Sequence, residues 1–561
     1  MSHIVRSLSW DTLWKQVRVW MDASMFFRVI DTVLGFFGKL LSGSFLADIF
    51  KAKIEDVLDH SVVIRLIRGF FRIFITLRRS FFKTAYENSG FVMLMNSFSA
   101  LILGSFVGQR LAGALGIEPE RPNKLNWLPT AILFTGIASL GVASFFFPIR
   151  LALIGAAVFV AAIIAFACPE LCIIGIAAAA PFLPTMTLAV ALGYCFACFV
   201  FKLLTNSSYS PDIDLTGYMI IIYAVAGIFV GATSLSPSSS INIVMLTTLF
   251  MSSHILIVIL INSRKKLDFM LFAFCTSAAV TGLIGLYQKV SGMVDQTWVD
   301  KELFEEVQLR IYSTFQNPNV YGAYLLLAIP MCLVMAYMAR KWYAKVYYSA
   351  ISVLLLYNLG FTYSRGCYLA LAVGLLIFIL FTERRLIAVF VAGVIALPFV
   401  IPASMLARLL SITNLEDSST SFRIYIWQAT LRILKDYWFA GLGQGIEAYN
   451  VVYPLYSFSN VPAPHSHNLY LQVFVETGIW GLLIFLSLLI AFFNTQARLF
   501  IKTRNAKLKI FLAAIMAAAC AFLFQGVFDY VFYNYRVMLT FFVFTGMAGS
   551  MVSIRMRSDF T

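Results

Sequence analysis

Residues 464–481 read PHSHNLYLQVFVETGIWG, and they close a stretch from Leu406 to Gly481 that interrupts an otherwise strongly apolar chain. Residues 406–466 contain no segment able to cross a bilayer, and the apolar helix that follows begins near His467. Loops of this length are usually functional or disordered. The Trp, Tyr and Phe content of this loop disfavours disorder. We therefore interpret the loop as the functional site and the remaining chain as its scaffold.

The composition indicates an integral membrane protein. Of 561 residues, 60% are hydrophobic and 12% are charged, and the mean hydropathy is +0.85. Apolar stretches near twenty residues recur, which is the length that crosses the hydrocarbon core. We expect an all-α polytopic membrane helix bundle of about 14 spans (range 12–14) with a long outward-facing loop. The expected spans are 127–147, 151–167, 170–182, 186–203, 217–234, 240–261, 268–288, 319–338, 346–361, 366–382, 386–405, 467–491, 509–527 and 532–553.

The positions of the basic residues predict the orientation. The net charge of +15 is carried by loops, as in membrane proteins whose cytoplasmic connections are basic and lie against anionic lipid. We therefore expect no nucleic-acid partner. Basic clusters fall on alternate connections, namely 264–266, 340–345, 384–385 and 498–509. Placing them in the cytoplasm puts both termini there and requires an even number of spans. Loop 406–466 then lies on the outer side of the membrane. ATP and nucleotide sugars are absent from that side.

Four parts of the chain follow from this reading. Residues 1–125 form basic amphipathic helices in the cytoplasm or its membrane interface, 126–405 and 467–561 form the bundle, and 406–466 form the outer loop. Between Val62 and Tyr86, cations recur every three or four residues among aliphatic and aromatic side chains, as in a helix lying among lipid headgroups. The alternative is a peripheral helix packed on the bundle. The eight cysteines lie mostly in apolar runs, and we interpret them as buried small hydrophobic residues.

Four short motifs occur in order on the predicted outer face. They are Asn317-Pro318-Asn319; Ser364-Arg365-Gly366; Phe422-Arg423 with Trp427 and Gly441-x-Gly443-x-Gly445; and His467-Asn468 followed by nine residues and Gly478-x-x-Gly481. In these motifs the chain resembles the bacterial O-antigen ligase and polymerase superfamily over roughly residues 300–490. The basic N-terminal segment has no counterpart in that pattern.

The resemblance implies a GT-C-like membrane glycosyltransferase of the bacterial cytoplasmic membrane. Such an enzyme moves a glycan from undecaprenyl diphosphate to an acceptor sugar hydroxyl on the outer face, with inversion at the anomeric carbon and without a cofactor. The implied partners are a lipid-linked glycan donor, a glycan or glycolipid acceptor, membrane lipids and envelope-assembly proteins.

The chemistry of the motif residues agrees with this reading. We assign the catalytic roles to Arg365, Arg423 and His467. A planar guanidinium stabilises the charge of a departing diphosphate. His467 stands near a helix start, where a neutral imidazole can accept a hydroxyl proton. The structural alternatives are an interfacial anchor for Arg365 and a helix-capping residue for His467; whether His467 acts as base or only positions the acceptor stays open.

Further residues are assigned to substrate binding. They are Asn468, His465, Glu476, Trp427, Asn317, Asn319 and Gly443. Glu476 lies nine residues into the helix after His467 and either orients a polar network or serves as an alternative base. Asp529 and Arg536 stand in the last outer turn and could pair across it. We see no cluster with metal-ligand spacing and predict no metal.

Two other classes of protein remain possible on the sequence alone. A transporter or flippase of small solutes or lipid-linked glycans predicts charged residues near the bilayer midplane and broken helices in symmetric halves. Here the polar residues gather on one face instead. The hypothesis of a non-catalytic scaffold for envelope assembly does not explain the Arg and His residues of the outer loop.

Overall fold

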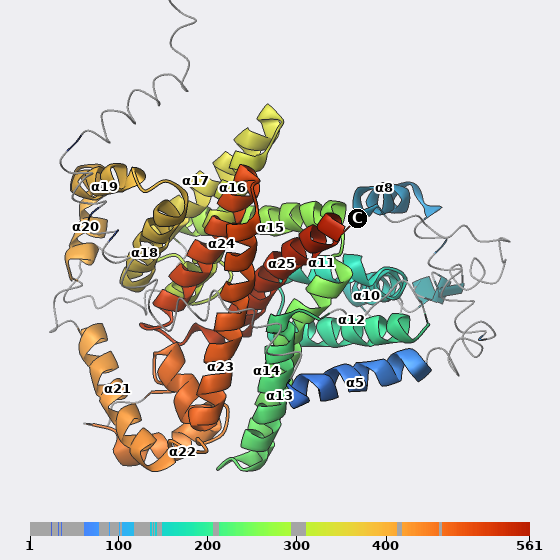
Figure 1. The fold of residues 1–561 in the computed structure, drawn as a ribbon, viewed down its shortest axis with the longest axis horizontal. Helices are drawn as coiled ribbons and strands as arrows, with labels where there is room; N and C mark the ends of the chain where they lie inside the picture. Colours follow the sequence, from blue (N-terminus) through green and yellow to red (C-terminus); the bar gives the residue numbers. More distant parts are fainter. Residues whose placement is uncertain are drawn as a thin grey trace, which may run out of the picture.

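The computed structural model describes residues 61–77, 104–116, 148–205, 213–292, 310–411, 418–458 and 463–560, with isolated positions before residue 148. Every regular element in these residues is a helix, which confirms the all-α class (Figure 1). The expected span 127–147, most of residues 1–125 and positions 293–309 of the outer connection lie outside the described residues.

The membrane bundle is confirmed by helices that are long and apolar enough to cross a bilayer. Within the described residues there are nine of them. They are α12 (Thr185–Thr205), α13 (Leu215–Ala232), α14 (Pro237–Leu260), α15 (Arg264–Ser291), α16 (Pro318–Met338), α18 (Arg365–Thr382), α23 (Leu469–Lys502), α24 (Ala506–Gln525) and α25 (Tyr535–Phe560).

Shorter or less apolar helices occupy the other expected spans within the described residues. They are α10 (Ile149–Ala167), α11 (Pro169–Ala179), α17 (Trp342–Phe361) and α19 (Leu386–Val400). α11 has 11 residues, too few to cross the hydrocarbon core alone, as its sequence predicts. The span expected at 386–405 divides, because Ile401 is extended and Pro402 begins the separate helix α20 (Ala403–Leu410).

The N-terminal amphipathic segment is described over α5 (Val62–Leu77) and α8 (Phe106–Leu115). α5 packs on the bundle: Ile64 is buried, and Arg68 Nε donates to the Tyr218 hydroxyl at 3.3 Å. Leu66, Phe70 and Ile73 are exposed, whereas Ile67 and Phe71 are half-buried. The helix is therefore attached to the bundle on one side and presents an apolar surface on the other.

The outer loop is largely helical. It contains α20, α21 (Ser418–Tyr437) and α22 (Ile446–Tyr456), and α21 and α22 lie beside the first part of α23 at the lower end of Figure 1. A small core of its own holds these helices together, with buried residues such as Ile433, Tyr449 and Val475. The described residues 418–458 of the loop thus form a packed unit.

α23 has 34 residues and is bent at Gly478. Gly478 has φ 64°, and a Cβ there would lie 2.3 Å from the Phe439 carbonyl oxygen. The next residue, Ile479, donates its amide to the Trp438 carbonyl at 2.8 Å. Glycine is required because the backbone is left-handed and the end of α21 packs directly against it. The bend separates a first segment, Leu469–Thr477, from the long span that follows.

The Gly441–Gly445 turn connects this bend to the corner between α13 and α14. Its three glycines all have positive φ. The Gly443 amide donates to the Glu476 carbonyl at 3.0 Å, and the Ser240 hydroxyl donates to the Gln444 carbonyl at 2.8 Å. The turn therefore positions the first segment of α23 against the bundle.

A buried polar group joins three helices elsewhere in the bundle. His254 of α14 is fully buried; its Nε2 lies 3.0 Å from Asp214 Oδ1, and its Nδ1 lies 3.0 Å from the Thr545 hydroxyl. Asp214 caps the first turn of α13, and Thr545 belongs to α25. Each polar group is thus satisfied by another helix, as buried polar groups require.

Replacing His254 by alanine is expected to lower the free energy of unfolding by about 1–3 kcal/mol, because Asp214 and Thr545 would each lose their bond to another helix and keep only the local bonds with the Gly217 amide and the Phe542 carbonyl. Thermal unfolding of the purified protein in one detergent measures the effect. Thr545→Val removes the hydroxyl that bonds to His254 and to the Phe542 carbonyl but leaves the His254–Asp214 pair, so it should cost less. A His254→Ala melting temperature equal to that of the wild type would contradict the clamp.

Candidate functional site

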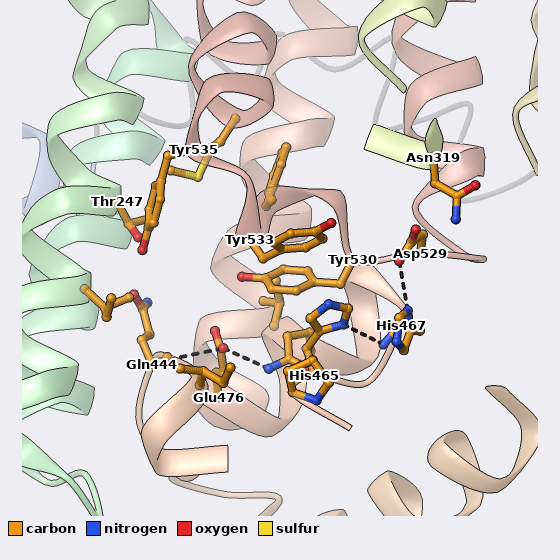
Figure 2. A pocket seen from close by; sticks show the side chains of 18 of the residues that line it. Thr247, Asn319, Gln444, His465, His467, Glu476, Asp529, Tyr530, Tyr533 and Tyr535 are labelled. Atoms are coloured by element: carbon orange, nitrogen blue, oxygen red, sulfur yellow. Dashed lines mark hydrogen bonds and ion pairs between the residues drawn. The ribbon is translucent and has the colours of Figure 1, made fainter. Parts of the chain in front are cut away.

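A cavity of about 1040 Å³ lies between the outer loop and the bundle. Its walls come from α13, α14, α21, the Gly441–Gly445 turn, the first segment of α23 and residues 529–542 (Figure 2). A small recess adjoins it and shares the lining residues Arg310, Asn319, Arg408 and Arg423. The cavity is at the upper end of the usual range for small-molecule sites, so it has room for more than one chemical group.

Three helices begin at this cavity and its recess. α16 is capped by Asn317, whose side chain accepts the Asn319 amide at 2.8 Å, and α23 is capped by Asn468, whose side chain accepts the Tyr470 amide at 2.9 Å. α18 begins at Arg365, a lining residue of the recess. Helix N-termini favour anions because their first amides point outward and their dipoles are positive there. The cavity is thus built to receive negative charge.

In each of these three helices, the residue that precedes the N-cap has a left-handed backbone conformation. They are Gln316 (φ 62°), Tyr363 (φ 51°) and His467 (φ 50°). Residues other than glycine seldom adopt this conformation, which costs of order 1 kcal/mol or more and concentrates at functional sites. The same sharp entry recurs at three helix starts around one cavity, which supports a functional reading of the cavity.

Four arginines gather beside these helix starts. Arg310, Arg365, Arg408 and Arg423 line the recess, and all except Arg365 also line the main cavity; we call this the arginine end. Arg310 is buried, and its side chain donates to Asn319 Oδ1 at 3.1 Å. Burial, followed by the charges of Arg408 and Arg423, lowers the pKa of Arg310 to about 9, so it remains a cation at neutral pH.

Sequence reasoning had selected only two of these arginines. Arg365 and Arg423 belong to the sequence motifs, whereas Arg310 and Arg408 stand outside all four motifs. Arg365 is held by the Ser411 carbonyl at 2.9 Å, which orients it from the loop side. Arg310 is fixed from the other side by the Thr362 carbonyl at 2.9 Å. Arg310 and Arg408 are identified as site residues only by the structure, which places them close to Arg365 and Arg423.

His467 faces the cavity with Asp529 behind it. Its Nδ1 lies 3.1 Å from Asp529 Oδ1, and Asp529 is 3% exposed. Burial alone would raise the pKa of the Asp529 carboxyl, but the hydrogen bond and charge of His467, together with Arg423, hold it below its usual value. An ionised carboxylate only accepts hydrogen bonds. Nδ1 therefore carries the proton, and in the neutral ring Nε2 has the free lone pair that a base requires.

The predicted pair between Asp529 and Arg536 is not formed. Asp529 contacts His467 instead, and Arg536 donates to the Thr314 carbonyl at 2.9 Å. The prediction failed because it considered only the two charges in one turn. Asp529 is thus a site residue that the sequence analysis missed, because its partner is 62 positions away.

His465 lies beside His467 and is 8% exposed. Its ring stacks on Tyr533 with centroids 4.9 Å apart, and its Nδ1 accepts the His467 amide at 3.2 Å. Burial, followed by the charge of His467, lowers the pKa of His465 to about 4. His465 is therefore neutral at pH 7 and positions the residue two places along the chain.

His465, His467 and Asp529 also form a group of the kind that can hold a metal. One ligand atom from each lies within 4.8 Å of the others, so the sequence-based reason for predicting no metal, the lack of a cluster, is not supported. The arginine end nevertheless opposes a divalent cation here, because Arg423 is close enough to influence the Asp529 carboxyl. The electrostatics of the cavity favour an anion.

The low pKa of His465 predicts a loss of stability in mild acid. The unfolded residue titrates near pH 6.5 and the folded one near 4, so the unfolded chain binds the extra proton between these values. The free energy of unfolding should fall by up to about 3 kcal/mol as the pH drops from 6.5 to 4. The pKa of Asp529 is lowered in the folded protein, so its contribution to the free energy of unfolding is lost only below about pH 4.

Thermal unfolding of the wild type and of His465→Gln at several pH values tests this. Glutamine can still accept the His467 amide but does not titrate, so the variant should show a shallower fall between pH 6.5 and 4. Identical slopes for the two proteins would contradict the assignment.

Glu476 lies at the opposite end of the cavity from Asn319 (Figure 2). It is 7% exposed, and its Oε1 accepts hydrogen bonds from Gln472 Nε2 at 2.9 Å and from the Gly445 amide at 3.3 Å. Gln472 in turn accepts the Ser466 amide at 2.7 Å. The Pro464–Asn468 segment and Glu476 are therefore joined through one side chain.

Three of the predicted binding residues do not line the cavity or its recess: Trp427, Gly443 and Asn468, which caps α23. Trp427 lies on α21, and its indole nitrogen is buried without a partner among the described residues. Gly443 lies in the turn described above, and a Cβ there would collide with Ser234. Neither is a lining residue of the cavity or its recess. Their geometry indicates packing, and the Gly443 amide is already bonded to the Glu476 carbonyl.

Comparison with known proteins matches residues 350–486 to the family model described as O-antigen ligase. This range includes Arg365, Arg423, His467 and Glu476, whereas Asp529 lies beyond it. A comparison with curated proteins finds no match. The helices, the cavity and this match agree on a multi-pass bacterial membrane protein with a ligase or polymerase role. The match over residues 350–486 supports the likeness of this chain to the O-antigen ligase and polymerase superfamily.

Proposed function

We propose that the protein transfers a glycan from undecaprenyl diphosphate to a hydroxyl of an acceptor sugar. The single observation that carries the proposal is the arginine end, where four guanidinium groups and the starts of α16 and α18 meet at one cavity. Like charges gathered in one site repel one another, and a bound multivalent anion would lower that repulsion. A diphosphate has the charge and the oxygen atoms to engage several arginines at once.

The reaction follows from this placement. The acceptor oxygen attacks the anomeric carbon of the donor while the bond from that carbon to the diphosphate oxygen breaks. The hydroxyl proton passes to Nε2 of His467, and Asp529 stabilises the imidazolium through Nδ1. The leaving diphosphate takes the bonding electrons and is stabilised by the arginine end. Attack opposite to the leaving group inverts the anomeric configuration, and no cofactor or metal takes part.

The proposed orientation places the cavity on the outer side of the cytoplasmic membrane, with both termini in the cytoplasm. Basic residues at the start of α15, including Lys266, support it. The undecaprenyl chain would enter laterally from the bilayer, and residues 1–125 would lie at the cytoplasmic interface. In this scheme the outer loop, residues 406–466, belongs to the catalytic part of the chain.

Proteoliposomes provide the test. Protein reconstituted with undecaprenyl-diphosphate-linked glycan and a lipid extract of the host envelope as acceptor should release undecaprenyl diphosphate and form a higher-mass glycan product. A transporter would instead move solute or lipid-linked glycan across the vesicle membrane without cleaving it. Flux with no release of undecaprenyl diphosphate would overturn the proposal.

A further inference from the structure

We infer that the Glu476 end of the cavity is a binding subsite for the sugar ring of the acceptor, an inference that rests on the proposed function. The subsite consists of Glu476, Gln444, Thr247, Tyr530 and Tyr535, all of which line the cavity. Figure 2 shows them grouped on the side away from Asn319 and Asp529. The class of ligand is an uncharged saccharide that presents hydroxyl groups.

Glu476 is the first observation. Both of its hydrogen bonds from protein go to Oε1, and within the described residues no cation pairs with it. Oε2 is thus left to the cavity that Glu476 lines. A buried carboxylate without a cation is costly to maintain. A ligand hydroxyl can form a hydrogen bond with this open oxygen, which the protein's own groups leave unsatisfied.

The surrounding wall has the composition of a carbohydrate site. The Tyr535 hydroxyl lies beside Thr247, and the Tyr530 ring projects into the space above Glu476 (Figure 2). Tyr223 and Phe485 add further aromatic surface, with ring centroids 6.3 Å apart. Aromatic faces pack on the apolar faces of sugar rings, while hydroxyl and amide groups fix the orientation. No lining arginine lies on this wall in the described structure, so a second phosphate group has no partner here.

The order of groups along the cavity identifies which sugar binds. Arg310 donates to Asn319, so the arginine end lies on the Asn319 side, and His467 stands between Asn319 and Glu476 (Figure 2). The donor carbon is bonded to the diphosphate at the arginine end. In a displacement with inversion, the attacking oxygen arrives from the side opposite the leaving group. The acceptor sugar therefore occupies the Glu476 side of His467.

Glu476→Gln is a sharp probe of this subsite. The amide oxygen can still accept the bonds from Gln472 and the Gly445 amide, so the change falls on the cavity-facing atom, which becomes a donor. Glu447→Gln is the matched control, since it removes an exposed carboxylate from α22 in the same loop. Thr247→Ala tests the facing wall independently.

The full chain in nanodiscs is titrated with the methyl glycosides of glucose, galactose, N-acetylglucosamine and heptose, with binding measured by saturation-transfer NMR. At least one glycoside should bind the wild type and Glu447→Gln equally. Glu476→Gln should weaken that binding about tenfold or more, and Thr247→Ala should weaken it less. Excess undecaprenyl diphosphate should leave glycoside binding in place, because the two ligands occupy different ends.

Three outcomes would overturn the inference: no glycoside binds the wild type, Glu476→Gln binds as the wild type does, or undecaprenyl diphosphate displaces the glycoside. The proposed function is tested by a separate measurement, the affinity of the wild type for undecaprenyl diphosphate. If that lipid binds and no glycoside does, the subsite fails and the proposed function stands. If glycosides bind and the lipid does not, the proposed function fails instead.

Discussion

His467→Ala is expected to lower the rate of glycan transfer by about 10²–10⁴-fold, the usual contribution of a general base. Alanine removes the nitrogen that takes the acceptor proton, and it leaves the Asn468 cap of α23 in place. The protein should therefore remain folded and inserted, and it should still bind undecaprenyl diphosphate at the arginine end. The readouts are release of undecaprenyl diphosphate from proteoliposomes and the accumulation of lipid-linked glycan in cells.

The role of Asp529 is tested with the same assay. Asp529→Asn removes the charge that holds the His467 ring, so it should reduce transfer, but by less than His467→Ala does. Because the two residues act as one unit, the double variant should be about as slow as His467→Ala alone. A wild-type rate of transfer in His467→Ala would show that His467 is not the general base. If the losses of rate in the two single variants multiply in the double variant, His467 and Asp529 act independently.

Arg423→Ala is expected to weaken the binding of undecaprenyl diphosphate by roughly 10–100-fold, which corresponds to one hydrogen bond between charged groups. Arg423 lines both the cavity and the recess, and its charge acts on Arg310 and Asp529. Arg423→Lys should recover only part of the affinity, because an ammonium lacks the planar pair of donors that matches a phosphate.

A second arginine of the same helix serves as the control. Arg432 lies on α21, is exposed and stacks on the Phe458 ring at 4.0 Å, and it lines neither the cavity nor the recess. Arg432→Ala should bind undecaprenyl diphosphate as the wild type does. Titration of the lipid into nanodisc-embedded protein measures both affinities. Equal losses in the two variants would mean that Arg423 contributes only through the general charge of the loop.

Much of the scaffold could be predicted from the sequence, because the bilayer imposes length and apolar composition on every span. The helix starts at Asn317 and Asn468 were also legible, since asparagine caps a helix and proline suits its first turn. The bend of α23 was not predicted. Gly478 suggests only close packing in a sequence, and the bend depends on the end of α21, around Phe439, which approaches it from about forty residues upstream.

The site was partly predictable for a different physical reason. Arg365, Arg423 and His467 stand in recognisable motifs, so local sequence identifies them. Arg310 and Asp529 stand in connections between helices and outside the motifs, and they become site residues only when α16, α18 and α23 begin at the cavity and its recess. Electrostatic partners that are far apart in the chain are a property of the tertiary structure, and a single sequence carries little signal for them.

Locating bound undecaprenyl diphosphate by cryo-electron microscopy of the protein in nanodiscs tests the proposed chemistry most directly. The diphosphate should lie within hydrogen-bonding distance of the guanidinium groups of Arg310, Arg365, Arg408 and Arg423, with Nε2 of His467 facing the space beyond it. Density for the diphosphate at the Glu476 end, or outside the cavity and its recess, would contradict both the proposed donor site and the mechanism built on it.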